Sequence, residues 1–265
     1  MTLYAPRSLD EALELRAGHP EAVPVAGGTD LMVAVNFGRA HPEALLDLSH
    51  VEELKGWWRE DDLVFVGAGM TFARIERELA EFRPLAQAAR SVGSPQIRNR
   101  ATIGGNVATG SPAGDAIPVL AAYEAEIVVG AVGVTRKVPW RAFFLGPKQT
   151  ALEPDELILG AEWTPADGPG SFAKVGPRNA MVIAVASVCL QRENGSVRLA
   201  LGSVAPTVIR AAHAEAYAGV DDDPAEFGRL AAADARPIDD VRGTAAYRRH
   251  VIEVLARRAL EGARC

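Results

Sequence analysis

Hydrophobic residues along the chain recur in short runs, and the spacing and borders of these runs predict alternating helices and strands. In the first segment, residues 1–54, Ser8 followed three positions later by Glu11 is typical of a helix start. The elements expected in this segment are a helix at Ser8–Leu15, a strand at Val23–Ala26, a helix at Asp30–Phe37 and a strand at Leu45–Leu48.

The second segment, residues 55–165, repeats this mixture of elements. We expect strands at Leu63–Val66, Glu126–Val129 and Leu157–Glu162, and helices at Thr71–Phe82, Pro84–Ser91 and Ala116–Tyr123. Between them, Gly93–Asp115 is rich in Gly, Ser, Asn and Pro, and is expected to be a long loop without regular structure. A loop of that length inside a compact domain is usually functional.

The third segment, residues 170–265, has a different pattern. Two apolar runs, Val182–Arg192 and Val197–Val204, are joined through Asn194-Gly195, and Asn-Gly is a strong hairpin signal. Helical stretches follow at Val208–Ala218, Pro224–Ala235 and Thr244–Ala263. We therefore expect a C-terminal α+β domain in which helices cover one face of an antiparallel sheet.

Composition narrows the possible functions. The 265 residues carry 28 Lys and Arg against 34 Asp and Glu, a net charge of −6, which argues against nucleic acid as a partner. No apolar run is long enough to cross a bilayer, and the first residues lack the layout of a signal peptide, so a cytoplasmic protein is expected.

Cysteine and histidine usage points away from a metal centre in this chain. The only cysteines are Cys189 and Cys265, whereas an iron–sulfur cluster needs about four thiolates. The histidines show no metal-ligand spacing. We predict no metal ligand and no catalytic acid, base or nucleophile, so redox chemistry would require an organic cofactor or a partner's metal.

The first glycine-rich turn is Ala26-Gly27-Gly28-Thr29-Asp30, between an expected strand and an expected helix. Paired glycines let a backbone approach a ligand closely, and N–H groups at a helix start suit a phosphate. The alternative is an ordinary turn that needs a positive φ, with Thr29 or Asp30 as a cap. This motif alone does not decide between the two.

The second glycine-rich turn is Thr102-Ile103-Gly104-Gly105-Asn106, followed by Ser111-Pro112 and Asp115. Hydroxyl and amide side chains surround the glycines, and a carboxylate such as Asp115 suits the hydroxyls of a ribose. The alternative is a surface loop with Asp115 capping the next helix.

A third glycine pair, Gly67-Ala68-Gly69, only begins like a dinucleotide-binding fingerprint, because Phe72 stands where the third glycine belongs. We interpret it as a strand end and turn, so a nicotinamide-binding Rossmann domain is not supported.

The two Gly-Gly turns in this order, with Gln96-Ile97-Arg98-Asn99 before the second and Ser111-Pro112-Ala113-Gly114-Asp115 after it, resemble the FAD-binding (medium) subunit of molybdenum hydroxylases, the carbon monoxide dehydrogenase and xanthine dehydrogenase family. The resemblance covers almost the whole chain. It implies a two-lobed FAD-binding domain of the vanillyl-alcohol-oxidase (PCMH) type, with lobes at residues 1–54 and 55–165, followed by a C-terminal antiparallel sheet with helices at 170–265.

The resemblance also implies where an extended FAD would lie. The pyrophosphate and ribityl chain would contact Ala26, Gly27, Gly28, Thr29 and Asp30 together with Thr102, Ile103, Gly104, Gly105 and Asn106. Asp115 would hold the adenosine ribose, Ile158 would pack near the adenine or flavin, and Lys174 would sit beside the isoalloxazine. A cation there would stabilise the reduced, anionic flavin.

The function implied is electron transfer. A molybdopterin-containing large subunit would hydroxylate the substrate, and 2Fe-2S clusters on a small subunit would pass electrons to this FAD and on to NAD+, oxygen or another acceptor. Two alternatives stay open: a self-sufficient FAD-dependent oxidoreductase of the same fold, and a scaffold protein that has lost FAD.

Overall fold

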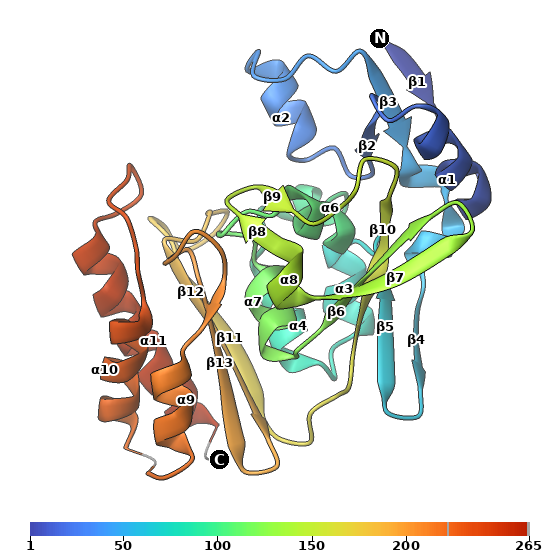
Figure 1. Ribbon diagram of the computed structural model, residues 1–265. Coiled ribbons are helices and arrows are strands. Elements are labelled where there is room, and N and C mark those ends of the chain that lie inside the picture. Colours follow the sequence, from blue (N-terminus) through green and yellow to red (C-terminus); the bar gives the residue numbers. More distant parts are fainter. Residues whose placement is uncertain (222, 264–265) are drawn as a thin grey trace.

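A computed structural model describes residues 1–221 and 223–263 of the chain (Figure 1). Its N-terminal part is a small parallel sheet with strand order β1-β3-β2, formed by β1 (Thr2–Tyr4), β2 (Val23–Val25) and β3 (Ala44–Asp47). Around it lie α1 (Leu9–Gly18), α2 (Leu31–Asn36) and the 3-10 turns η1 (Leu48–His50) and η2 (Glu52–Lys55). Ser8 caps α1 as expected, because its hydroxyl oxygen accepts a hydrogen bond from the Glu11 N–H at 3.2 Å.

The middle part of the chain is built on an antiparallel sheet with strand order β4-β5-β10-β6-β7. Its strands are β4 (Trp57–Glu60), β5 (Leu63–Gly67), β6 (Glu126–Ala131), β7 (Val134–Pro139) and β10 (Leu157–Trp163), and a separate small hairpin is made by β8 (Phe144–Gly146) and β9 (Gln149–Thr150). The helices of this part are α3 (Phe72–Glu78), α4 (Arg83–Ser91), α5 (Pro95–Arg98), α6 (Ile103–Thr109), α7 (Ala116–Ala122) and α8 (Trp140–Phe143).

The expectation of a structureless loop over Gly93–Asp115 is wrong, because this stretch contains α5 and α6. Both helices are short and begin at hydroxyl caps that composition alone did not reveal. Ser94 accepts a hydrogen bond from the Ile97 N–H at 3.4 Å, and Thr102 accepts one from the Gly105 N–H at 3.1 Å.

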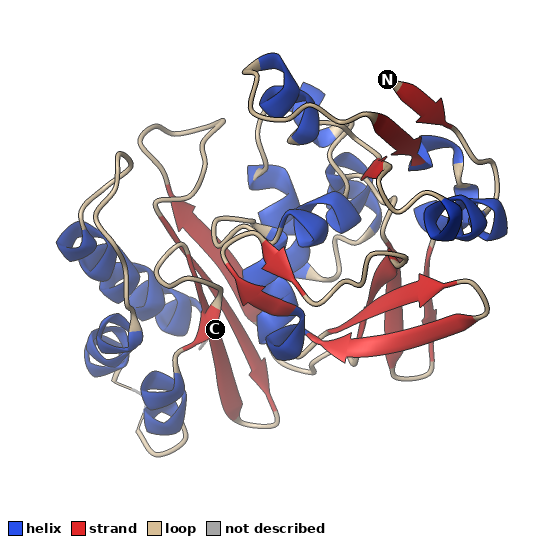
Figure 2. Ribbon diagram, turned by 45° about the horizontal axis from the view of Figure 1, so that its top comes forward, coloured by secondary structure: helices blue, strands red, loops and turns tan. Residues whose placement is uncertain are grey.

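The C-terminal part is an antiparallel sheet with strand order β11-β12-β13-β14 (Figure 2). Its strands are β11 (Gly170–Val175), β12 (Ala186–Glu193), β13 (Ser196–Gly202) and β14 (Ile209–Arg210), and its helices are α9 (Ala212–Ala218), α10 (Pro224–Asp234) and α11 (Ala245–Gly262). The Asn194-Gly195 hairpin joins β12 to β13 as expected. The start of the expected helix Val208–Ala218 is instead the edge strand β14.

Helices cover both faces of this C-terminal sheet, whereas the sequence led us to expect them on one face. Leu190 and Leu199 belong to the cluster that includes α10 and α11 residues, while Cys189 and Ala200 belong to the cluster that includes α4 and α7 residues. Alternate strand positions point to opposite faces, so β12 and β13 are apolar on both sides. The second covering layer comes from the middle part of the chain.

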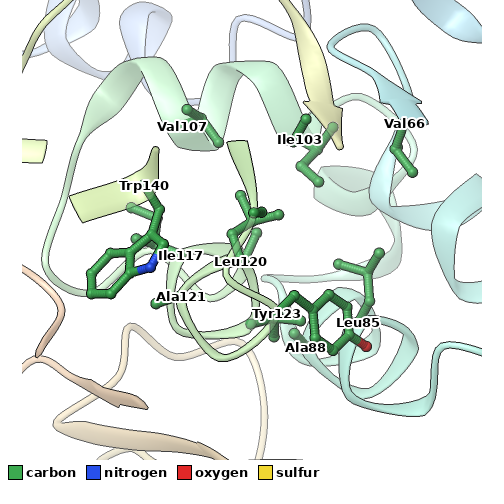
Figure 3. Packing of buried hydrophobic residues seen from close by; sticks show 14 of the residues in the cluster. Val66, Leu85, Ala88, Ile103, Val107, Ile117, Leu120, Ala121, Tyr123 and Trp140 are labelled. Atoms are coloured by element: carbon green, nitrogen blue, oxygen red, sulfur yellow. The ribbon is translucent and has the colours of Figure 1, made fainter. Parts of the chain in front are cut away.

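Figure 3 shows the packing around α7. Ile117 and Leu120 of this helix lie near Val107 of α6 and Leu85 of α4. Every residue of α7 is buried. The helical layer between the two larger sheets therefore joins the middle and C-terminal parts into one core.

Candidate functional site

The first glycine-rich turn presents a row of unpaired backbone donors. It leaves the end of β2 and enters α2, with Gly28 at φ +70°. Within the described part of the chain, no protein acceptor receives a hydrogen bond from the N–H groups of residues 27–31. Asp30 makes no capping bond with its side chain, although Gly28 has the positive φ that an ordinary turn needs. Successive free N–H groups in a turn form a site for an anion such as a phosphate.

The two glycine-rich segments touch each other. A Cβ on Gly27 would lie 2.0 Å from the Arg100 carbonyl oxygen, so only glycine lets the first turn rest on the backbone just before the second. The absence of a Cβ at Gly27 therefore serves contact between the two glycine-rich segments, whereas the sequence predicts contact with a ligand.

The backbone donors of the second turn are already used. The N–H groups of Ile103 and Gly104 bond to the carbonyls of Met70 (3.0 Å) and Ala68 (2.9 Å). A Cβ on Gly104 would lie 2.5 Å from the Ala68 Cβ, so this glycine also serves packing. Thr102 is buried and caps α6.

Gly105 and Asn106 are the more open positions of this turn. Gly105 is exposed, and a Cβ there would meet only the Thr102 hydroxyl oxygen, at 3.2 Å. The Asn106 side-chain oxygen accepts a hydrogen bond from the Ala116 N–H at 3.3 Å, so Asn106, rather than Asp115, supplies the side-chain cap of α7.

Gly105→Ala tests whether the cofactor lies against this turn. Alanine is favoured over glycine inside a helix by roughly 0.5–1 kcal/mol, so the free energy of unfolding should not fall. If FAD packs on the exposed face of Gly105, the added methyl group should weaken FAD binding by about tenfold, or about 1.4 kcal/mol. Titration of the apoprotein with FAD measures this, and an unchanged dissociation constant would remove Gly105 from the site.

A buried ion pair joins the middle and C-terminal parts beside α6. Lys174 Nζ on β11 lies 2.5 Å from Asp115 Oδ2, and each side chain is 8% exposed. The ammonium also donates to the carbonyls of Ser91 (2.8 Å) and Val182 (3.1 Å), so its three protons all have protein acceptors. The sequence did not indicate a role for Ser91 or Val182, because they contribute backbone carbonyl groups, which every residue has.

Asp115 keeps one oxygen without a partner. The Ser91 hydroxyl lies 3.3 Å from Oδ2, whereas Oδ1 is buried and has no hydrogen-bond partner among the described residues. Burial raises the pKa of Asp115, and the charge of Lys174 opposes part of that shift. A buried acceptor without a partner costs about 1–3 kcal/mol, so this atom fits a site that receives a donor from a ligand.

The ion pair brings two predicted site residues together. Asp115 is expected at the adenosine ribose and Lys174 at the isoalloxazine, the two ends of an extended FAD. In the structure their charged atoms are in contact.

Ile158 lies on β10 beside a register shift and is 8% exposed, within the main hydrophobic cluster.

The described residues contain no group of three or more His, Cys, Asp or Glu side chains that could hold a metal ion. Cys189 is buried and free, and Cys265 lies outside the described residues. None of the described helices is both long and apolar enough to span a membrane.

Three features lie together in this structure: a strand-to-helix turn with free N–H groups, a second turn packed against it, and a buried acceptor without a partner. Together they define a protein that binds an anionic, dinucleotide-like cofactor. Comparison with known families identifies it further. Residues 1–162 match the FAD binding domain in molybdopterin dehydrogenase, and residues 171–263 match the CO dehydrogenase flavoprotein C-terminal domain. The chain belongs to this family of FAD-binding oxidoreductase subunits.

Individual relatives agree with the family match. The chain is 30% identical to the xanthine dehydrogenase FAD-binding subunit of Escherichia coli O157:H7, over 97% of this chain and 93% of the relative. It is 31% identical to the carbon monoxide dehydrogenase medium chain of Hydrogenophaga pseudoflava, over 98% and 96%.

Solved structures show the same fold. Carbon monoxide dehydrogenase from Hydrogenophaga pseudoflava superimposes with a TM-score of 0.90 at 32% identity, covering 99% of this chain and 96% of that chain. Quinoline 2-oxidoreductase from Pseudomonas putida 86 gives 0.91 at 25% identity, covering 99% and 96%. The expected fold class, family and FAD cofactor are confirmed.

Proposed function

We propose that this chain is the electron-transfer subunit of a molybdenum-containing hydroxylase or dehydrogenase complex. Its partners would be a molybdopterin-containing large subunit and a small subunit with 2Fe-2S clusters. FAD, when bound, supplies a centre that takes up electrons from those clusters and releases them to NAD+, oxygen or another acceptor. Relatives named as medium or FAD-binding subunits support an assignment of the FAD to this chain and of the metal centres to its partners. The presence of only two cysteines supports it as well, because an iron–sulfur cluster needs about four thiolates.

The observation that best supports FAD binding by this chain is the row of free N–H groups at residues 27–31. These groups would bind the FAD pyrophosphate, with Thr29 and Asp30 alongside. The second turn would bind mainly through Gly105 and Asn106, while Thr102, Ile103 and Gly104 would hold the turn in place.

Asp115 and Lys174 would face the isoalloxazine half of the cofactor. Asp115 has one oxygen, Oδ1, that is open to a donor from a ligand. The flavin ring system offers a single N–H at its imide, which matches one open acceptor. Lys174 would then keep Asp115 ionised and oriented, and Ile158 would pack at the same end.

The isolated chain, loaded with FAD, should not oxidise any hydroxylase substrate. Hydroxylation by water requires the molybdenum centre, and this chain cannot supply even one iron–sulfur cluster. The experiment assays the chain against purines, aldehydes and N-heterocycles, with and without its partner subunits, while metal analysis excludes molybdenum and iron. Transfer of electrons from NADH to an artificial acceptor can persist.

Substrate turnover by the metal-free chain would contradict the subunit proposal and favour a self-sufficient flavoenzyme of the same fold. A purified chain that binds no FAD would favour the scaffold alternative instead. A visible absorption spectrum of the purified protein distinguishes these two results.

A further inference from the structure

Helix α7 is held to both edges of the C-terminal sheet by charged side chains. At its start, Asp115 pairs with Lys174 on β11. Just after its end, Glu124 pairs with Arg210 on β14. Since the strand order is β11-β12-β13-β14, these two strands are the opposite edges of the sheet.

Helix α7 and the residues that flank it reach across the sheet. The helix itself, Ala116–Ala122, is about 10 Å long at about 1.5 Å per residue, with Asp115 before it and Glu124 after it. Three spacings between neighbouring strands, at about 4.8 Å each, give about 14 Å, so the flanking residues are needed to reach both edges. The helix packs on β12 and β13 between the two ion pairs.

The ion pair at the far end is part of a larger network. Besides Glu124, the Arg210 guanidinium binds both carboxylate oxygens of Glu215 on α9, with Nη2–Oε2 at 2.9 Å. It also lies 3.4 Å from the Ala121 carbonyl oxygen in the last turn of α7, where a cation is favoured. Glu215 in turn accepts a hydrogen bond from the Leu199 N–H at 2.7 Å.

Glu124 is fixed from the other side as well. Arg141 Nη2 and Trp140 Nε1 donate to its second oxygen at 2.5 and 3.1 Å. Its backbone has φ 54°, a left-handed conformation that is unfavourable for a residue with a side chain. A charged residue therefore occupies a position where glycine would relieve the backbone.

The middle of the helix lies directly against β13. A Cβ on Gly202 of β13 would lie 2.9 Å from Pro118 Cγ of α7 and 2.3 Å from Ser187 Oγ. The helix and the sheet are in close contact here, so loss of an edge attachment would let the sheet rotate about this contact. An attachment at one edge limits such rotation less than attachments at both edges.

We propose that Arg210 is a positioning residue for the cofactor site, although it lies at the opposite edge of the sheet. By fixing β14 to the end of α7, it sets the angle of the sheet across the helix and so holds Lys174 against Asp115. This inference rests on the proposed function, in which the Lys174–Asp115 pair faces the bound FAD.

The experiment measures the FAD dissociation constant of the full chain and its variants by titration of apoprotein. Arg210→Gln should bind FAD about tenfold more weakly, a typical size for coupling between separated sites. Arg229→Gln is the matched control, because Arg229 makes a similar two-point ion pair with Glu226 but lies exposed within α10. It should bind FAD like the wild type.

A double variant separates positioning from a general loss of stability. If Arg210 acts through Lys174, Arg210→Gln should add little, less than about twofold, to the effect of Lys174→Met, because the two losses share one contact. Should Arg210→Gln fail to fold, Arg210→Lys keeps the charge but loses the two-point geometry, and should show a smaller weakening of the same kind.

Wild-type FAD affinity in Arg210→Gln, or fully additive effects in the double variant, would overturn the inference. Failure of the proposed function gives a different result: the wild-type chain does not bind FAD, or Lys174→Met binds it normally.

Discussion

Replacing Lys174 with methionine should destabilise the protein by about 3 kcal/mol and sharply reduce FAD retention. The change removes the partner of a carboxylate that is almost fully buried, and a charge left unpaired in the interior is costly. It also releases the Ser91 and Val182 carbonyls that the ammonium holds. Denaturant unfolding gives the stability, and the flavin absorbance of purified protein gives the retention.

Two controls make this result specific. Lys55→Met removes a lysine that pairs with Glu52 at the surface, and should change stability by less than about 1 kcal/mol. The double variant Asp115→Asn with Lys174→Met leaves no buried charge at these two positions, so it should be more stable than Lys174→Met alone. Unchanged stability in Lys174→Met would mean that the pair does not form.

Gly27→Ala should destabilise the protein by about 1–3 kcal/mol and abolish normal FAD binding. The new methyl group would overlap the Arg100 carbonyl, which belongs to backbone and cannot rotate away. The first turn would therefore lift from the second, and the free N–H groups of residues 27–31 would no longer face the same ligand. Thermal unfolding and FAD titration measure the two effects separately.

Gly18→Ala is the control for this variant. Gly18 ends α1, and an added Cβ there would meet nothing within 4 Å. It should not lower stability and should leave FAD binding unchanged. If Gly27→Ala behaves in the same way, the two glycine-rich segments do not depend on their contact.

Local signals in the sequence determined much of the secondary structure and the family. The Ser8 cap and the Asn194-Gly195 hairpin lie where the sequence placed them, because each depends on residues within a few positions of one another. The paired glycines, read together and in order, indicated the FAD-binding family, which the family models confirm.

Only the tertiary structure decided what the predicted site residues contact. Asp115 and Lys174 are 59 positions apart, and nothing in either segment indicates that they form an ion pair. The sequence predicts a ligand contact at Gly27 and Gly104, and the structure adds that their missing Cβ atoms make room for Arg100 and Ala68. The apolar runs of β12 and β13 likewise gave no sign of what covers their second face. Each of these features depends on which distant segments meet when the chain folds, and a local pattern does not contain that information.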